Sequence, residues 1–272
     1  MPELPELETV GRGLALRLLE QKVASVWQGQ LRLRIPMPAR LDDSLQDRKL
    51  EAVERRAKYL LLRFSGHKTL IVHLGMSGRM TIAEAQAARQ KHDHLVIGFA
   101  DGAYLTFNDA RRFGLIDLVE TGREDAHPLF RHLGPEPLEK SFTPARLAQQ
   151  LEGRKTALKV ALLDQSVVVG VGNIYASEAL FLAGIHPETV CMKAAKHSES
   201  LVECIRKVLA DAIESGGSSL RDFVHISGET GYFQHRFNVY EREEEPCFTC
   251  NAAIRSLRQA GRSTFYCPRC QR

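Results

Sequence analysis

Apolar residues near the start of the chain recur at spacings of three and four positions. The repeating positions are Leu4, Leu7, Val10, Leu14 and Leu18. This spacing places the side chains on one face of an α-helix, so we predict a helix from about Glu3 to Leu19. Because Gly11 and Gly13 weaken its intrinsic stability, we expect the helix to pack against another part of the protein.

Six short apolar segments follow between residues 23 and 119. Glycine, aspartate and other polar residues separate them, which is typical of short strands joined by turns. The segments are Val23–Trp27, Tyr59–Phe64, Thr69–Leu74, His94–Phe99, Tyr104–Phe107 and Leu115–Val119. Strands without intervening helices predict an antiparallel β-sandwich or barrel, fronted by the first helix.

The pattern becomes helical after a proline-containing connection that runs from His127 to Pro137. Thr143 followed by Pro144 is typical of a helix start, because threonine caps the first turn and proline fits its first position. We predict helices over about 144–151, 156–164, 173–183 and 198–215. The chain is then a multi-domain α+β protein with a β-sandwich domain (1–126), a helical domain (127–235) and a cysteine module (236–272).

The composition of the 272 residues is that of a globular protein, with 44% hydrophobic and 26% charged residues. No apolar stretch approaches the roughly 20 residues that span a membrane, and the N-terminus lacks a signal-peptide pattern. We therefore expect a cytoplasmic protein, monomeric and without a membrane partner. The net charge of +4, with basic clusters such as Arg55–Lys58 and Arg111–Arg112, permits nucleic acid as a partner.

Two Cys-x2-Cys pairs lie near the C-terminus, separated by sixteen residues. The four cysteines are Cys247, Cys250, Cys267 and Cys270. Four thiolates at this spacing can bind one Zn²⁺ tetrahedrally, and they leave no open position for catalysis. Metal binding would also supply the folding energy that so small a module lacks. We therefore predict one structural Zn²⁺.

The linker between the cysteine pairs has β character at Thr264-Phe-Tyr266, which predicts a hairpin. Three arginines of the linker and one arginine between the last two cysteines have no acidic neighbours in sequence. They are Arg255, Arg258, Arg262 and Arg269. Such a hairpin could contact phosphates or could simply be a solvated basic face, and these residues alone leave both interpretations open.

The chain begins Met1-Pro-Glu-Leu-Pro-Glu6. If Met1 is removed, Pro2 presents a secondary amine, which can form an iminium with an aldehyde-like carbon and titrates near pH 8. The carboxylates of Glu3 and Glu6 lie close enough in sequence to move protons there. Taken alone, the segment is better interpreted as a simple tail before the helix.

Two further motifs could contact a nucleic acid. Gly170-Val-Gly-Asn173 predicts a tight turn and a helix N-terminus at which a phosphate could approach, and Tyr175 excludes a dinucleotide fingerprint. Met76, Arg111 and Phe113 lie at predicted strand ends. They could be wedge residues that enter an opened duplex, but taken alone they are better interpreted as ordinary packing residues.

These motifs, taken in order, resemble the formamidopyrimidine-DNA glycosylase family over essentially the whole chain. The resemblance depends on Met1-Pro-Glu-Leu-Pro-Glu6, Arg55-Arg-Ala-Lys-Tyr-Leu-Leu-Leu62, His73-Leu-Gly-Met-Ser-Gly78, Lys91-His-Asp-His94, Arg111-Arg-Phe-Gly114, Gly170-Val-Gly-Asn-Ile-Tyr-Ala-Ser-Glu178, Gly261-Arg262 and the cysteine pairs. It implies a β-sandwich, a helix–two-turn–helix domain and a β-hairpin zinc finger. The implied partner is double-stranded DNA with oxidised bases or abasic sites.

The resemblance also implies a role for individual residues of this chain. Pro2 would form a Schiff base with the damaged nucleoside, Glu3 would transfer protons, and Lys58 and Arg262 would support the β- and δ-eliminations. The implied DNA contacts are His92, Arg111, Lys155 and Asn173, and the implied wedge is Met76, Arg111 and Phe113. Base recognition would involve Glu6 and a capping loop with Ser227, Gly228, Thr230 and Tyr232.

Two other functions remain open at this stage. An endonuclease VIII-type glycosylase, which acts on oxidised pyrimidines, would share the fold but usually has glycine where this chain has Leu4. A non-catalytic zinc-finger protein that binds damaged DNA would share the basic surfaces. The joint presence of Pro2, Glu3, Lys58 and Arg262 favours a bifunctional glycosylase and lyase that removes 8-oxoguanine and formamidopyrimidines.

Overall fold

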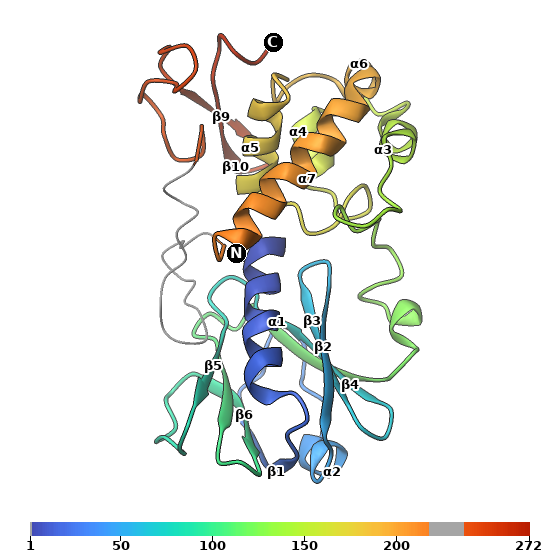
Figure 1. Ribbon diagram of the computed structural model, residues 1–272, viewed down its shortest axis with the longest axis vertical. Helices are drawn as coiled ribbons and strands as arrows, with labels where there is room; N and C mark the ends of the chain where they lie inside the picture. The colour runs from blue at the N-terminus through green and yellow to red at the C-terminus, as the bar shows by residue number, and fades with distance from the viewer. Residues whose placement is uncertain (1, 218–236) are drawn as a thin grey trace. The chain divides into compact units, whose positions relative to one another are not determined.

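The computed structural model describes residues 2–217 and 237–272, which form two compact units (Figure 1). The first unit comprises residues 2–131 with 216 and 217, and the second comprises 132–215 with 237–272. The second unit therefore includes both the helical region and the cysteine module. The finer division into three domains stays a prediction.

The first unit is built from two antiparallel four-stranded sheets. One sheet has the order β1 (Val23–Gln28), β6 (Asp93–Phe99), β7 (Tyr104–Asn108) and β5 (Arg79–Ala83). The other has the order β2 (Leu50–Arg56), β3 (Tyr59–Phe64), β4 (Lys68–His73) and β8 (Leu115–Glu120). The predicted sandwich is confirmed, and β2 and β5 are additional edge strands that the apolar pattern did not predict.

Helix α1 (Leu4–Leu18) packs against the sheet that contains β2 and β3 (Figure 1). Its predicted apolar face is buried and joins residues of both sheets in one core. Gly11 permits the close approach, because a Cβ there would lie 3.2 Å from the Leu60 side chain. The short helices α2 (Leu41–Leu45) and η1 (Glu124–Ala126) complete the unit.

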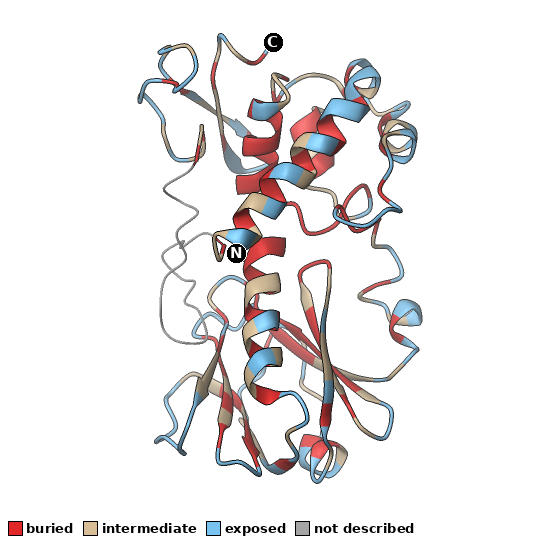
Figure 2. Ribbon diagram, in the orientation of Figure 1, coloured by how far each residue is buried: buried red, intermediate tan, exposed pale blue. Residues whose placement is uncertain are grey.

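The second unit is built on the buried helix α5 (Asn173–Leu182) (Figure 2). The other helices are α3 (Pro144–Leu151), α4 (Leu158–Leu162), α6 (Cys191–Ala194), η2 (Ala195–His197) and α7 (Ser198–Glu214). Helix α5 contacts α4, α7 and the strand β10 (Arg262–Tyr266). The predicted cap of α3 is confirmed, since the Thr143 hydroxyl accepts a hydrogen bond from the Arg146 backbone N–H at 3.2 Å. Among the described residues, no helix is long and apolar enough to cross a bilayer.

The cysteine module contains the predicted hairpin, formed by β9 (Arg255–Gln259) and β10 (Arg262–Tyr266). Its two-residue turn places Ala260 and Gly261 at positive φ, as a tight hairpin requires. The module packs onto α5 through Phe181. The buried carboxylate of Glu178, also in α5, accepts hydrogen bonds from three consecutive backbone N–H groups of residues 238–240, all within 2.9 Å.

Candidate active site and nucleic-acid interface

The N-terminal segment is held in place by the start of α1. Pro2 is buried, and the exposed fractions of Glu3 and Glu6 are only 3% and 2%. The Glu3 backbone N–H donates to the Glu6 carboxylate at 2.8 Å, as part of a capping box that closes the first turn of the helix. Pro2 therefore lies directly before an ordered helix start. The carboxylates of Glu3 and Glu6 belong to that helix start and are close to Pro2 in sequence.

Lys58 lies in the two-residue turn between β2 and β3 and is 6% exposed. Arg55 fastens this turn to α1. Its guanidinium forms an ion pair with Glu8 of α1 at 3.0 Å and donates to the Ala57 carbonyl at 3.0 Å. The helix that begins beside Pro2 and the turn that carries Lys58 are thus joined through one arginine in the same unit.

Two neighbouring loops of the first unit, residues 74–77 and 109–114, carry the predicted wedge; we call them the wedge loops. The side chains of Met76 and Phe113 are apolar and yet 37% and 48% exposed. Arg111 is also exposed, and its guanidinium lies 5.0 Å from the centroid of the Phe113 ring. Large apolar side chains at exposed loop tips indicate a surface that contacts a partner.

The buried carboxylate of Asp109 links the two wedge loops. One oxygen accepts hydrogen bonds from the Ser77 hydroxyl at 2.6 Å and the Arg111 backbone N–H at 3.2 Å. The other accepts from the Gly114 N–H at 2.8 Å. Asp109 thus holds the loop of Met76 and the loop of Arg111 and Phe113 in one arrangement.

The base of the first wedge loop depends on His73 and Gly75. The Gly75 N–H donates to Nδ1 of His73 at 2.9 Å, which requires an unprotonated Nδ1. Burial, aided by the charges of Arg34 and Lys58, lowers the pKa of His73 to about 4, so the ring is neutral near pH 7. A Cβ at Gly75 would lie 2.4 Å from the Gly114 nitrogen, so the loops touch where only glycine fits.

His92 lies just before β6 and beside the second wedge loop. It is half-buried, and its carbonyl accepts a hydrogen bond from the Asp109 N–H at 3.0 Å. The structure therefore brings His92, Arg111 and the wedge residues into one region of the first unit.

The remaining predicted DNA contacts, Asn173, Lys155 and Arg262, belong to the second unit. Asn173 is the first residue of α5, and its Nδ2 donates to the Ser263 carbonyl at 2.9 Å, directly after Arg262. Arg262 is exposed at the start of β10. Lys155 is exposed on the connection between α3 and α4. The structure thus brings Asn173 next to the β9–β10 hairpin, which carries Arg262.

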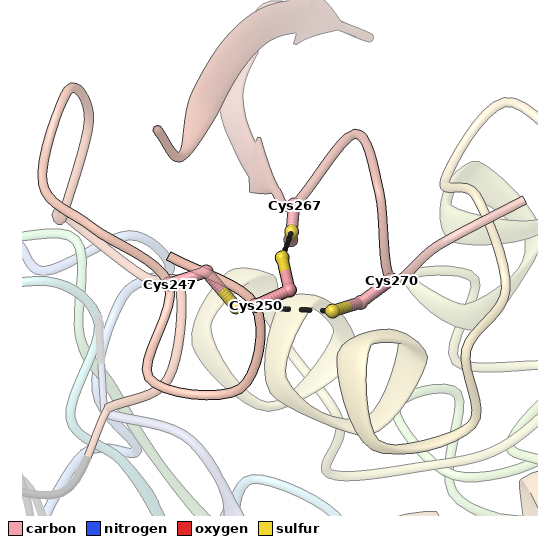
Figure 3. A group of neighbouring side chains, drawn as sticks. All are labelled: Cys247, Cys250, Cys267 and Cys270. Carbon is pink, nitrogen blue, oxygen red and sulfur yellow. Dashed lines mark hydrogen bonds between the residues drawn. The ribbon is translucent and has the colours of Figure 1, made fainter. Parts of the chain in front are cut away.

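The four cysteines of the C-terminal module converge on one point (Figure 3). Their sulfur atoms all lie within 4.8 Å of one another, and the Cys247–Cys270 and Cys250–Cys267 pairs are 3.8 Å and 3.4 Å apart. Tetrahedral Zn–S bonds of about 2.3 Å require sulfurs about 3.8 Å apart. The cluster therefore fits one structural Zn²⁺, as predicted.

Sequence comparison matches three stretches of the chain to family models. Residues 1–116 match the formamidopyrimidine-DNA glycosylase N-terminal domain, and residues 133–224 match the formamidopyrimidine-DNA glycosylase H2TH domain. Residues 244–272 match the zinc finger found in FPG and IleRS. The chain belongs to the formamidopyrimidine-DNA glycosylase family.

Relatives of known name support this membership over the full length. The chain is 50% identical to the formamidopyrimidine-DNA glycosylase of Dinoroseobacter shibae and 49% identical to that of Azorhizobium caulinodans, with 100% of both chains covered in each case. A crystal structure of a Lactococcus lactis Fpg mutant with Fapy-dG containing DNA has a TM-score of 0.92 at 36% identity, with 100% of both chains covered. A complex of Lactococcus lactis Fpg with abasic-site DNA has a TM-score of 0.90 at 36% identity, covering 99% of each chain.

Within this glycosylase fold, the sequence did not single out Asp109, Glu178 or Lys159 as important. All three are charged residues that are buried, and burial is not visible in a sequence without periodicity around the residue. Lys159 offered one signal, since it interrupts the apolar run from Leu158 to Leu163. The predicted base-recognition residues Ser227, Gly228, Thr230 and Tyr232 lie outside the described residues.

Proposed function

We propose that the protein is a bifunctional DNA glycosylase and abasic-site lyase that excises oxidised purines during base-excision repair. The observation that carries the proposal is the ordered N-terminus. Pro2 and the buried carboxylate of Glu3 directly precede a capped helix, and the buried carboxylate of Glu6 lies in its first turn. The chain belongs to the glycosylase family. The protein would act as a monomer in the bacterial cytoplasm, on the DNA of the nucleoid.

The proposed reaction begins at the amine of Pro2. Its lone pair attacks C1′ of the damaged nucleoside, the bond from C1′ to the base breaks, and the base leaves with a proton. The bond from C1′ to the ring oxygen O4′ then breaks, O4′ takes a proton, and the nitrogen forms an iminium with C1′. The resulting iminium makes the C2′ proton acidic, so its removal expels the 3′ phosphate, and a second elimination expels the 5′ phosphate. Glu3 would donate or accept protons at the sugar, while Lys58 and Arg262 would stabilise the departing phosphates.

The wedge loops and the second unit would hold the opened duplex. Extruding a nucleotide costs a few kcal/mol in lost stacking and pairing, and side chains inserted into the gap offset that cost. Met76, Arg111 and Phe113 are exposed, as such a role requires, and the Arg111 guanidinium lies over the Phe113 ring. Arg111, His92, Lys155 and Asn173 would contact the DNA, and Glu6 with the capping loop would recognise the extruded base.

Trapping with borohydride tests the proposal. On a duplex with a single 8-oxoguanine, borohydride should reduce the iminium and leave a covalent adduct of protein and DNA. Replacing Pro2 by glycine changes the secondary amine to a primary one and alters its placement, so we expect adduct formation to fall strongly. The matched control is Pro5→Gly, which makes the same exchange inside α1 and should still form the adduct.

Three outcomes would contradict parts of the proposal. Binding of the damaged duplex without any adduct would indicate a non-catalytic DNA-binding protein. Preferential excision of thymine glycol over 8-oxoguanine would indicate an enzyme for oxidised pyrimidines. An intact mass that includes Met1 in a fully active preparation would exclude the Pro2 nitrogen, because a retained Met1 makes it an amide.

A further inference from the structure

Lys159 is a fully buried lysine at the centre of the second unit, with a side chain that is 0% exposed. It lies in α4, and its ammonium donates three hydrogen bonds. The acceptors are Asn173 Oδ1 at 2.8 Å, Thr264 Oγ1 at 2.7 Å and the Ser263 carbonyl at 3.3 Å. An ammonium has three N–H donors, and these three oxygens are placed to accept from it.

The three acceptors come from two elements that both carry predicted phosphate contacts. Asn173 begins α5, and Ser263 with Thr264 continues β10 directly after Arg262. The Asn173 amide also donates to the Ser263 carbonyl at 2.9 Å, so Lys159, Asn173 and Ser263 are each hydrogen-bonded to the other two. Lys159 fixes which end of the Asn173 amide is the acceptor, and this leaves the second N–H of Nδ2 for a partner beyond the network.

Lysine is rarely buried without a compensating role, because removing an ammonium from water is costly. An apolar residue of similar size would fill the same volume in this core without that cost. The structure instead retains a charge at the junction of α4, α5 and the zinc-finger hairpin. A bonded network of this kind specifies one arrangement of the groups around it.

We propose that Lys159 is a positioning residue that locks the hairpin strand carrying Arg262 to the helix N-terminus carrying Asn173, so that both residues meet the DNA phosphates together. This inference rests on the proposed function, since it assumes that Arg262 and Asn173 contact phosphates. Lys159 itself does not touch the DNA, because it is enclosed by protein.

The salt dependence of DNA binding tests the inference, because a buried lysine releases no counterions from DNA. The probe is a duplex with a tetrahydrofuran abasic-site analogue, and binding is measured by fluorescence anisotropy over a range of salt concentrations. Arg262→Gln should reduce the slope of log K against log salt by about one. We expect Lys159→Met to reduce the slope by a similar amount and to weaken binding about tenfold at low salt.

The double variant Lys159→Met with Arg262→Gln separates positioning from a general loss of stability. If Lys159 acts through Arg262, the double variant should show no slope change beyond that of Arg262→Gln alone. The matched control is Leu162→Ala, which destabilises the same helix by about 2–5 kcal/mol but removes none of the three hydrogen bonds. Its slope should equal that of the unmodified protein at temperatures where it is folded.

An unchanged slope in Lys159→Met, or an equal slope change in Leu162→Ala, would overturn the inference. If Lys159→Met does not fold, Thr264→Val removes one acceptor while keeping the side-chain shape. It should shift the slope in the same direction, and an unshifted slope would also overturn the inference. If the unmodified protein shows no preference for damaged over undamaged duplex, the proposed function has failed instead.

Discussion

The wedge loops and the zinc-finger hairpin both present exposed side chains, but different forces hold them. The wedge loops extend from a β-sandwich whose apolar core includes residues of α1 and of both sheets. The hairpin belongs to the cysteine module, whose buried residues Val239, Ile254 and two of the cysteines pack with Phe181 of α5 in one small cluster. Most of its stabilisation must therefore come from the metal cluster and from hydrogen bonds to α5.

This difference shows that one protein can place rigid side chains by burying a large core or by binding a metal. The two regions should consequently fail under different conditions. Metal removal should affect the hairpin alone, whereas loss of buried polar groups should affect the wedge loops. Trp27, the single tryptophan of the chain, lies in β1 and reports on the sandwich only.

Zinc removal should have the largest effect. Structural zinc contributes about 10 kcal/mol or more to the folding of small modules, so a strong chelator should unfold the hairpin and abolish DNA binding. The fluorescence of Trp27 should not change, and neither should the urea-unfolding transition of the sandwich that this fluorescence reports. Zinc release is followed with a chromogenic dye, and Cys204→Ser, a cysteine outside the cluster, should respond to the chelator as the unmodified protein does. A coincident change in Trp27 fluorescence would contradict the separation.

Replacement of Asp109 by alanine should have the next largest effect and should act on the sandwich. It removes the acceptor shared by three donors of the wedge loops, among which the Gly114 N–H is buried, and we expect this to lower the free energy of unfolding by about 3 kcal/mol. Urea denaturation followed by Trp27 fluorescence measures the loss. As a control, Asp101→Ala removes an exposed ion pair with Arg17 and should cost about 1 kcal/mol or less. Equal losses of unfolding free energy in the two variants would show that the hydrogen bonds of Asp109 stabilise the sandwich no more than an exposed ion pair does.

Lowering the pH should destabilise the sandwich through His73. Its pKa is lowered from 6.5 to about 4 in the folded protein. Full stability is therefore present above about pH 6.5, where the ring is neutral in both states. Stability falls as the pH drops towards 4, because the unfolded chain binds the proton first. At about 1.4 kcal/mol per pH unit the total loss is about 3 kcal/mol.

The variant His73→Asn checks the origin of this loss. The asparagine amide oxygen can accept the hydrogen bond from the Gly75 N–H but does not titrate. The unfolding free energy of the variant should therefore depend less on pH than that of the unmodified protein between pH 6.5 and 4. If both proteins lose the same stability over this range, other groups cause the loss.

The sequence predicted those parts of the fold that depend on local patterns. Apolar runs located the buried strands, and the Cys-x2-Cys pairs located the metal cluster. Strands β2 and β5 were missed because they are edge strands with polar and charged residues on their exposed sides, so neither forms an apolar run. Helix α4 is shorter than predicted, since it begins at Leu158 and not at Thr156.

The candidate site divides in the same way. Pro2, Glu3 and the wedge residues were found because motifs carry them, and their individual roles stay predictions. Asp109 and Lys159 were missed because their importance depends on partners distant in sequence; Lys159 bonds to residues more than 100 positions away. A lysine in an apolar segment is visible in the sequence, but its acceptors become known only from the fold.

The contact between Gly75 and Gly114 has a consequence for how this enzyme can change over generations. The two glycines lie at the roots of the wedge loops, where an added methyl group would collide with backbone. Met76 and Phe113 lie at the tips, where solvent leaves room for other side chains. Inheritable variation can therefore accumulate at the tips, while the roots keep the same two residues.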